Sequence, residues 1–435
     1  MCALHYSQKL LTNKSFASII LISRCKEREK MYLNRQKYLD KLISQKDKDI
    51  IKVITGIRRS GKSVLLFNIY YDYLVSSGVN KDHIIKINLE TKKNEGLRNS
   101  DALYNEIVKQ IADDDKYYVF IDEIQFVDGF EDVVNGLRVD YNCDVYITGS
   151  NSKLLSKDIN TKMRGRSIEI KVYPLSFAEF YDYYGGEKRQ CFNNYLLYGG
   201  LPYLLSEDDN KNKVEYLKMI CDTVVGKDII DRHGIRQDDV FEAVINFLCS
   251  NIGSYVSANK IADTLKSNGY SKITHDTIGK YLEFICDAFL FYKAERYDIK
   301  GKQYLKTLNK YYIADLGIRN SKLNYRQIEI THSLENVIYL DLIRRGYIVD
   351  IGKNNSKEID FVTRDDKNLY YIQVAYTLSD PAKNEQEISS FYGLDDGYKK
   401  IVITMDDDPF VNLEKGYKKI NVFDFLLDDN SLIKI

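Results

Sequence analysis

Residues 53–66 read VITGIRRSGKSVLL and contain the pattern G-x-x-x-x-G-K-[ST]. Gly56 and Gly61 allow the backbone to curl so that its N–H groups point at phosphate oxygens. We expect Lys62 to neutralise the β- and γ-phosphates and Ser63 to offer its hydroxyl to Mg²⁺. The preceding IIKVIT is typical of a buried strand, and the following KSVLLFNIYYDYLV has apolar residues at helical spacing. Strand, glycine-rich loop and helix in this order predict a P-loop, or Walker A motif, within an α/β fold.

A second motif predicts the acidic residues that a P-loop ATPase needs. Residues 117–125 read YYVFIDEIQ, an apolar run that ends in Asp122 and Glu123. Ligands of open α/β sheets bind at the carboxyl ends of strands. We therefore predict Asp122 as a Mg²⁺ ligand (Walker B) and Glu123 as the group that orients and deprotonates the attacking water. The alternative is that the two acids only cap a turn.

A third strand, in CDVYITGSNSKLL, ends in Thr148, Ser150 and Asn151, whose side chains could sense the γ-phosphate. The alternative is an ordinary strand-to-turn transition rich in Ser and Asn. The sequence thus predicts ATP and Mg²⁺ as cofactors, with Ser63 and Asp122 as metal ligands. The residues predicted to contact the nucleotide are Gly56, Arg58, Arg59, Ser60, Gly61, Lys62, Ser63, Val64 and Asn151.

Length and composition exclude several classes of protein. At 435 residues the chain is long enough for two to four domains. It has no apolar run of membrane-spanning length, its seven cysteines lack C-x-x-C spacing, and its five histidines form no zinc signature. Because the net charge is zero, any nucleic-acid binding must come from a local basic surface. We expect a cytoplasmic protein without a membrane partner, and we interpret residues 1–30 as a disordered extension preceding a natural start at Met31.

Several motifs together resemble the AAA-type (AAA+) ATPases of bacteria and archaea, in the family whose C-terminal half is a domain of unknown function. They are the P-loop with its two arginines, IDEIQ, GSNSKLL, the box RGR…PLSFAEF, and YLLYGGLPYLL. The resemblance implies an ATPase core over residues 31–175 and a helical lid over 176–235. A homo-oligomer is a further expectation for this chain. Pro174 is expected to end a strand, with a helix beginning near Ser176.

Four arginines have two possible interpretations. Arg164 and Arg166 could stabilise the transferred phosphoryl group, in the same chain or in a neighbouring one, and Arg166 is our candidate catalytic arginine. Alternatively, they are solvated or pair with nearby acids. The same two interpretations, contact with phosphate or solvation and pairing with nearby acids, apply to Arg58 and Arg59. The Gly-Gly-x-Pro sequence at 199–202 is expected to form a turn between helices.

Residues 236–319 are expected to form a winged helix-turn-helix. Three amphipathic helices, with Ser257 and Thr274 as N-caps, precede two strands around a loop. Thr274 to Ala288 would be the recognition helix and the hairpin would be the wing. A local positive surface for double-stranded DNA is expected from the cations of the hairpin, Lys293, Arg296, Lys300, Lys302, Lys306 and Lys310. The alternative is a packing module with solvated lysines.

Residues 320–435 contain Glu335, Asp360 and Gln373 in the order used by restriction-endonuclease-like folds. That fold holds a metal with acids and activates water with a lysine two residues after the third position, where this chain has Ala375. The alternative is that Lys357 or Glu358 compensates, although the spacing does not require it. We therefore predict a degenerate nuclease-like α/β domain that does not cut DNA.

The sequence as a whole predicts an ATP-binding and ATP-hydrolysing switch that engages DNA through a winged helix. The first alternative is an active ATP-gated nuclease. The second is a nucleotide-binding scaffold for a protein partner.

Overall fold

The computed structural model describes residues 33–155, 161–163, 165–270, 273–326, 329–407 and 416–434. Residues 1–30, Met31 and Arg164 lie outside this part of the chain. The predicted disordered extension, the predicted start at Met31 and the predicted role of Arg164 therefore stay predictions. None of the helices in the described segments is both long and apolar enough to cross a membrane.

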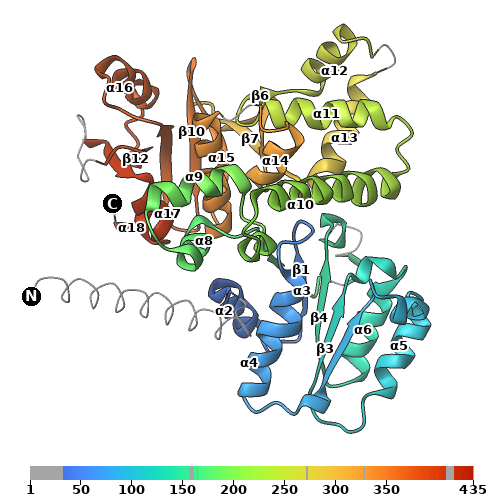
Figure 1. Ribbon diagram of the computed structural model, residues 1–435. Coiled ribbons are helices and arrows are strands. Elements are labelled where there is room, and N and C mark those ends of the chain that lie inside the picture. The colour runs from blue at the N-terminus through green and yellow to red at the C-terminus, as the bar shows by residue number, and fades with distance from the viewer. Residues whose placement is uncertain are drawn as a thin grey trace, which may run out of the picture.

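The N-terminal half is a parallel five-stranded sheet between helices (Figure 1). The strand order is β2-β3-β4-β1-β5. The strands are β1 (Ile51–Thr55), β2 (Ile84–Asn88), β3 (Tyr117–Asp122), β4 (Cys143–Gly149) and β5 (Ser167–Lys171). All four strand pairs are parallel, which brings the ends of β1, β3 and β4 to one edge of the sheet.

Helices cover both faces of this sheet because each presents an apolar stripe to it. Leu103 of α5 and Val134 of α6 belong to the core on one face, while Leu42 of α2 and Leu74 of α4 belong to the core on the other. The helices are α2 (Gln36–Gln45), α3 (Lys62–Val64) continuing through η2 (Leu65–Tyr70) into α4 (Tyr71–Ser76), α5 (Ser100–Lys109) and α6 (Phe130–Asp140). Short helical turns are η3 (Lys81–His83), η4 (Lys92–Leu97), η5 (Ile124–Phe126) and η6 (Ser152–Leu155).

A helical segment follows β5 and lies over the edge of the sheet where the P-loop is located (Figure 1). It contains α8 (Phe177–Tyr184), α9 (Lys188–Tyr198), η7 (Pro202–Ser206), α10 (Asn210–Thr223) and η8 (Val224–Asp231). The predicted helix start near Ser176 is confirmed: its hydroxyl accepts from the backbone of Glu179, whose carboxylate accepts from the backbone of Ser176. We refer to residues 176–231 as the lid.

The C-terminal half is built on a mixed eight-stranded sheet of order β13-β12-β11-β10-β9-β7-β8-β6. Its strands are β6 (Tyr255–Val256), β7 (Phe291–Asp298), β8 (Gln303–Ile313), β9 (Ile348–Asn354), β10 (Lys357–Arg364), β11 (Leu369–Ala375), β12 (Lys399–Thr404) and β13 (Lys418–Asn421). Its helices are α11 (Asp238–Ser250), α12 (Ala258–Ser267), α13 (His275–Asp287), α14 (Leu316–Lys322), α15 (Ile330–Arg345), α16 (Pro381–Ile388), η9 (Ser389–Phe391), α17 (Val422–Leu427) and α18 (Ser431–Lys434). The N-caps predicted at Ser257 and Thr274 are confirmed.

The β7–β8 hairpin, expected to be the wing of a winged helix, is part of this sheet. β7 pairs in parallel with β9, with Arg296 opposite Ile351, and Ile299 after β7 packs into the core beside Ile359. Pairing with β9 satisfies backbone groups that a free strand edge would expose. The expected boundary between residues 319 and 320 falls within α14, and one hydrophobic core extends from Phe177 in the lid to Leu432 in α18.

Candidate nucleotide-binding site

The P-loop connects the end of β1 to the helix that begins at Lys62. Gly56 has φ 140°, and a Cβ atom there would lie 2.1 Å from the carbonyl oxygen of Val172. Gly61 has φ 97°. Both positions need glycine, because other residues rarely adopt these dihedral angles and the first also has no room for a side chain.

Lys62 presents an uncompensated cation to this loop. Its side chain is buried, and its Nζ donates to the carbonyl oxygens of Gly56 at 2.9 Å and Ile57 at 3.1 Å. Burial lowers the pKa of Lys62. Within the described chain, Lys62 has no carboxylate at ion-pair distance. An incoming phosphate would supply the missing negative charge.

The two predicted metal ligands, Ser63 and Asp122, lie close together at the edge of the sheet where β1 and β3 end. The Ser63 hydroxyl donates to Asp122 Oδ1 at 3.0 Å, and the Asn88 amide donates to Asp122 Oδ2 at 3.0 Å. Burial raises the pKa of Asp122. A hydroxyl and a carboxylate are hard oxygen donors of the kind that Mg²⁺ prefers, so this pair fits that ion.

Glu123 extends from a strained backbone position beside Asp122. It has φ 56°, its N–H donates to Thr148 Oγ1 at 3.1 Å, and its carboxylate accepts from Gln125 and from Ser150 Oγ at 3.4 Å. A non-glycine residue in this region persists only where surrounding contacts hold it. Thr148 and Ser150, which we expected to sense phosphate, hydrogen-bond to the acidic pair.

Asn151 follows β4, the strand between β1 and β3, and is buried. It does not line the cavity described below. Its predicted contact with nucleotide remains a prediction.

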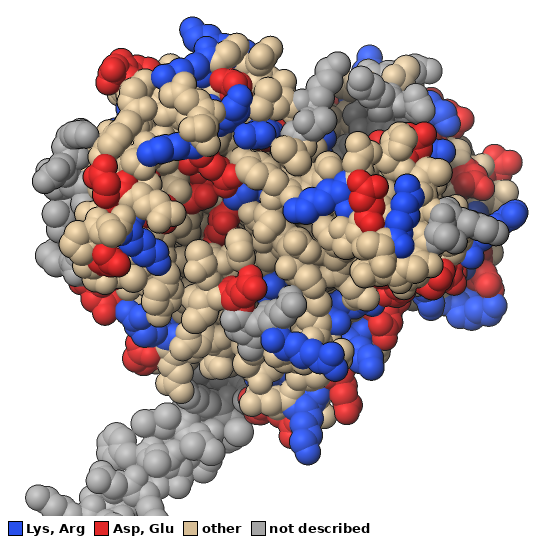
Figure 2. Space-filling model, turned by 90° about the horizontal axis from the view of Figure 1, so that it is seen from above, with Lys and Arg blue, Asp and Glu red and all other residues tan. Residues whose placement is uncertain are grey.

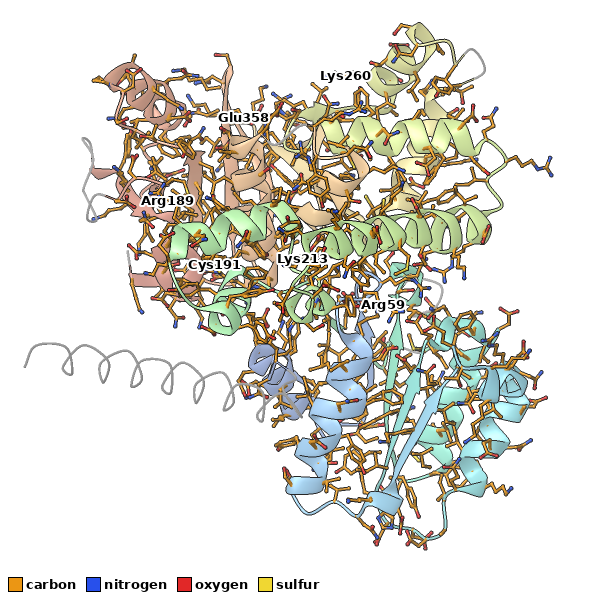
Figure 3. The ribbon with its side chains drawn as sticks, viewed as in Figure 1. Arg59, Arg189, Cys191, Lys213, Lys260 and Glu358 are labelled. Carbon is orange, nitrogen blue, oxygen red and sulfur yellow. The ribbon has the colours of Figure 1, made fainter. Side chains whose placement is uncertain are left out.

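The two P-loop arginines have different surroundings. Arg58 makes a bidentate pair with Asp228 of η8, with both N···O distances at 2.8 Å, and also contacts Glu90 at 3.2 Å. Arg59 is exposed, has φ 65° and lines the cavity below the lid (Figure 3). Arg58 therefore joins the P-loop to the lid, whereas Arg59 faces the space that a ligand would enter.

Arg166 lies at the wrong end of the sheet to act in its own chain. Its carbonyl oxygen accepts from Ile51 N at 2.8 Å, at the start of β1, whereas the P-loop follows the end of that strand. At about 3.3 Å per residue, five residues separate the two ends by roughly 15 Å. Parallel pairing of β5 with β1 fixes this position, so of the two possibilities left open by the sequence the structure disfavours action within the same chain, and the role of Arg166 in a neighbouring chain stays a prediction.

A cavity of about 650 Å³ lies between the P-loop and the lid. Its polar side includes Lys62, Ser63 and Glu123, together with the charged residues Arg35, Arg58, Arg59 and Glu90. Its other side is largely apolar and is formed by Leu33, Val64, Ile69, Pro202, Tyr203, Leu205, Tyr216 and Met219. The rings of Tyr203 and Tyr216 lie 4.3 Å apart, and Tyr203 remains 52% exposed. The cavity has the size and the polarity difference that a nucleotide requires.

The sequence analysis missed three contributors to this site, Arg35, Asp228 and Tyr203. Arg35 donates to the Ser60 carbonyl at 3.0 Å and forms an ion pair with Glu179 of α8 at 2.9 Å. Arg35 and Asp228 lie outside every quoted motif, and Tyr203 lies within YLLYGGLPYLL, a motif that supported the family resemblance without marking a ligand contact. The turn expected at 199–202 is present between α9 and η7, and its Pro202 also lines the cavity.

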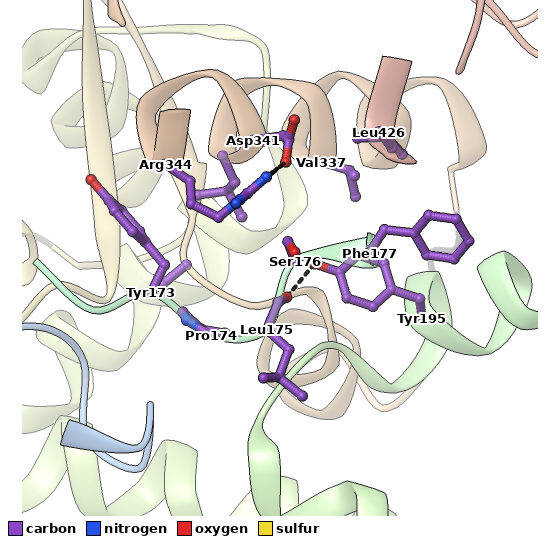
Figure 4. Close-up of a pocket in the computed structure, with 12 residues that line it drawn as sticks. Tyr173, Pro174, Leu175, Ser176, Phe177, Tyr195, Val337, Asp341, Arg344 and Leu426 are labelled. Carbon is purple, nitrogen blue, oxygen red and sulfur yellow. Dashed lines mark hydrogen bonds and ion pairs between the residues drawn. The ribbon is translucent and has the colours of Figure 1, made fainter. Parts of the chain in front are cut away.

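A second, smaller hollow lies where the lid packs on α15 (Figure 4). It has a volume of about 20 Å³ and lies beside the ion pair of Arg344 with Asp341, 2.6 Å long. This volume suits about one water molecule, so the hollow cannot hold a nucleotide.

The nuclease-like residues do not form an open site. Glu335 and Asp360 are buried, and the Gln373 amide donates to Glu387 of α16 at 2.8 Å. Lys310, which we expected on the DNA-binding surface, is instead buried against Glu335. That expectation is wrong because β8 continues into the shared sheet and turns this residue inward.

The remaining hairpin cations also differ from expectation. Lys293 pairs with Glu295 at 2.8 Å, and Arg296 lies over the ring of Tyr255. Lys300 and Lys302 are exposed, and the side chain of Lys306 lies outside the described part. On the face of the molecule farthest from the five-stranded sheet, cationic and anionic residues are interspersed (Figure 2).

The chain matches two family descriptions and two curated relatives. An "AAA domain" matches residues 48–181, and a "Domain of unknown function (DUF8612)" matches residues 189–329. An uncharacterized protein of Haemophilus influenzae is 40% identical over 381 residues, covering 86% of this chain and 94% of the relative. An uncharacterized protein of Methanocaldococcus jannaschii is 32% identical over 397 residues, covering 86% of this chain and 85% of the relative.

Among solved structures, the chain has a TM-score of 0.28 and 11% identity with Cdc6p of Pyrobaculum aerophilum, over 67% of this chain and 95% of that one. It has the same TM-score and 12% identity with the Orc1 protein of Aeropyrum pernix in complex with DNA, over 67% of this chain and 92% of that one. These scores are too low to support an argument about function.

Proposed function

This chain belongs to a family of AAA-domain proteins, and we propose that it binds ATP with Mg²⁺ beneath its lid and hydrolyses ATP as a molecular switch. One observation carries the proposal. The Lys62 ammonium, which makes no ion pair within the described residues, lines the polar end of one cavity of nucleotide size together with Ser63 and Glu123, and Asp122 accepts a hydrogen bond from Ser63.

Each residue has a chemical role in this proposal. Lys62 compensates the charge of the β- and γ-phosphates, and Ser63 with Asp122 would hold the metal. Mg²⁺, when bound, neutralises charge that develops on the phosphate oxygens. Glu123 orients the attacking water and accepts its proton. Arg166 can contribute only to the nucleotide of a neighbouring copy, which would require a homo-oligomer.

Calorimetric titration with ATP and Mg²⁺ tests the proposal. Wild-type protein should bind, and Lys62→Ala should not, because the triphosphate loses its buried counter-charge. Lys109→Ala, an exposed lysine at the end of α5, is the matched control and should bind normally. Equal affinity in wild type and Lys62→Ala would refute the role of Lys62, and a wild type that does not bind would refute the proposal itself.

The apolar side of the cavity supports recognition of the base. Tyr203 is an exposed aromatic residue next to Tyr216, and stacking of a base on an aromatic ring contributes about 1–3 kcal/mol. Tyr203→Ala should therefore weaken ATP binding by roughly 5- to 150-fold while leaving inorganic triphosphate binding unchanged. Parallel losses for both ligands would contradict base stacking.

The contact between the P-loop and the lid supports the proposal of a switch, because Arg58 of the P-loop forms an ion pair with Asp228 of the lid. A γ-phosphate near Arg58 would compete with this carboxylate for the guanidinium group. Binding and hydrolysis would thus change how firmly the P-loop is connected to the C-terminal half, which shares one core with the lid.

We further propose that the C-terminal half engages double-stranded DNA. The element order α11-β6-α12-α13-β7-β8 supports a winged helix, and Lys300 and Lys302 remain exposed at the hairpin tip. Replacing both with Ala should weaken binding to unrelated duplexes equally and reduce the salt slope by up to about two, one per lost phosphate contact. Lys109→Ala serves again as the control.

One observation favours a protein partner as the second candidate. The exposed positions of α13 include Asp276, Lys280 and Glu283, so this helix presents more negative than positive charge to its surroundings. Phosphate would be repelled by the two acids. If the lysine double variant binds DNA as the wild type does, or if the wild type binds no duplex, the protein-partner function is favoured over the DNA function.

A further inference from the structure

An ammonium group lies at the centre of a carboxylate cluster in the C-terminal half. The Nζ of Lys310, on β8, is 2.8 Å from Glu335 Oε1 of α15 and 2.5 Å from Glu358 Oε1 of β10. Figure 3 labels Glu358 in the half of the molecule above the lid, apart from Arg59 at the P-loop. The cluster is therefore distinct from the nucleotide-binding cavity.

The two charges at its centre are withdrawn from solvent. Lys310 is 4% exposed and Glu335 6% exposed, and the Tyr312 hydroxyl donates to the same Glu335 oxygen at 2.6 Å. Burial alone would lower the pKa of Lys310, but the carboxylates around it raise that pKa above its ordinary value. Conversely, burial would raise the pKa of Glu335, but Lys310 holds it below its ordinary value. Each group therefore keeps the other ionised.

A third carboxylate completes the cluster. Asp360, on β10, accepts from Val374 N at 2.8 Å and is close enough to Lys310 and Glu335 to interact with both charges. Burial, followed by the charge of Glu335, raises the pKa of Asp360 well above its ordinary value. Lys310 therefore keeps Glu335 ionised, whereas Asp360 favours its protonated form beside that charge.

The position of the ammonium nitrogen excludes a metal ion. An ion that bridged Glu335 and Glu358 would lie about 2.0–2.1 Å from their oxygens for Mg²⁺, or about 2.3–2.6 Å for Ca²⁺. The nitrogen already bridges the same two oxygens at 2.8 and 2.5 Å. The two cations would occupy overlapping space, so they cannot be bound together.

We infer that the Lys310 ammonium is the built-in cation of the Glu335–Glu358–Asp360 cluster, in the place that a divalent metal ion would take. The lysine comes from the hairpin, so it also ties β8 to α15 and β10. The cluster is a filled structural centre, and removal of the lysine side chain turns it into a site for a divalent cation with oxygen ligands.

The test counts Mn²⁺ ions bound to nucleotide-free protein, by the loss of the free-ion signal in electron paramagnetic resonance. Lys310→Ala, which opens space for an ion and its waters, should bind one more Mn²⁺ per chain than the wild type. The double variant Lys310→Ala/Glu335→Gln should lose that ion. Lys310→Met is the size-matched control: it removes the charge but fills the space, so it should gain no ion.

Two results would overturn the inference. One is an equal Mn²⁺ count for the wild type and for folded Lys310→Ala. The other is a Mn²⁺ site in the otherwise wild-type protein that Glu358→Gln removes, a result that does not depend on whether a Lys310 variant folds. Should Lys310→Ala unfold without metal, Mn²⁺ is expected to restore its folding, and a failure of Mn²⁺ to do so also counts against the inference.

Discussion

The P-loop and the carboxylate cluster of the C-terminal half are both built around a buried lysine, but their charges are arranged in opposite ways. The Nζ of Lys62 donates to two carbonyl oxygens of its own loop, makes no ion pair in the part of the chain that the structure describes, and lies beside a cavity of about 650 Å³. Lys310 is enclosed by Glu335 and Glu358. A binding site needs both an unbalanced charge and room for a ligand, whereas a balanced and enclosed charge contributes to stability. Variants that separate binding from stability therefore test this contrast.

The largest effect is expected from Glu123→Gln, which tests whether the P-loop site hydrolyses ATP. The amide keeps the shape of the side chain and leaves Asp122 in place, but it cannot accept a proton, so turnover should fall by about 10²- to 10⁴-fold. ATP affinity and the unfolding midpoint should change little. Steady-state phosphate release, with calorimetric binding beside it, measures both; turnover at the wild-type rate would remove Glu123 from its role.

The second prediction compares the two lysines directly, with methionine in place of each. Lys310→Met leaves Glu335 buried without its cation and should lower the free energy of unfolding by about 3–5 kcal/mol. Lys62 makes no ion pair among the described residues, so Lys62→Met leaves no buried carboxylate without its partner there; the stability of the nucleotide-free protein should be unchanged or higher, while ATP binding is lost. Urea unfolding gives the free energy of unfolding of each variant, and ATP titration gives its affinity for ATP. Similar losses of stability in the two variants would contradict the proposed difference between Lys62 and Lys310.

The third prediction concerns Asp315, a buried carboxylate that makes no ion pair with any residue that the structure describes. Asp315 accepts from the backbone N–H groups of Gly200 and Ile318, yet burial raises its pKa to about 6. Because the folded-state pKa lies above the unfolded value of about 3.9, the folded protein binds this proton more tightly. The stabilisation that this bound proton gives to the folded state is therefore complete below about pH 4. It amounts to up to about 3 kcal/mol and is lost as the pH rises through 6.

Asp315→Asn isolates this effect, since the amide does not titrate. The difference in unfolding free energy between wild type and variant should decrease from pH 4 to pH 7, as measured by urea denaturation at each pH. Parallel pH profiles for the two proteins would show that Asp315 has an ordinary pKa. Glu335, whose lysine lowers its pKa, should behave in the opposite way and lose stability only on further acidification.

The smallest effect is expected at Arg58, which connects the nucleotide site to the lid. Arg58→Lys keeps the charge but cannot make the bidentate pair with Asp228, and it should cost about 1–2 kcal/mol in stability without nucleotide. If ATP draws Arg58 away from Asp228, saturating ATP should reduce the difference between variant and wild type. Thermal unfolding with and without ATP measures this; a difference that ATP leaves unchanged would argue against the competition.

Much of the candidate nucleotide-binding site was predictable from the sequence because its signals are local. The order of strand, loop and helix around Lys62, and the acids directly after β3, follow from residue type and spacing over fewer than fifteen positions. The N-caps at Ser176, Ser257 and Thr274 are similarly local, since each side chain bonds to a backbone group three residues away. Such patterns depend little on the rest of the fold.

The roles of Arg58, Arg166 and Lys310 were not predictable in this way. Arg58 meets a carboxylate 170 residues away, and Lys310 meets one 25 residues away on a different element. A charged residue on a strand has the same sequence pattern whether it faces solvent or a buried partner, and strand pairing decides between the two.

By itself, the sequence determined the P-loop, the acidic pair and the type of most helices and strands, because these follow from backbone geometry and short-range hydrogen bonds. Only the tertiary structure decided that β7 pairs with β9, that Arg166 lies at the far end of β1, and that Lys310 turns inward. The physical reason is that burial and ion pairing depend on segments brought together from distant parts of the chain. Their free energy arises from the packed whole and leaves no local signature in the order of residues.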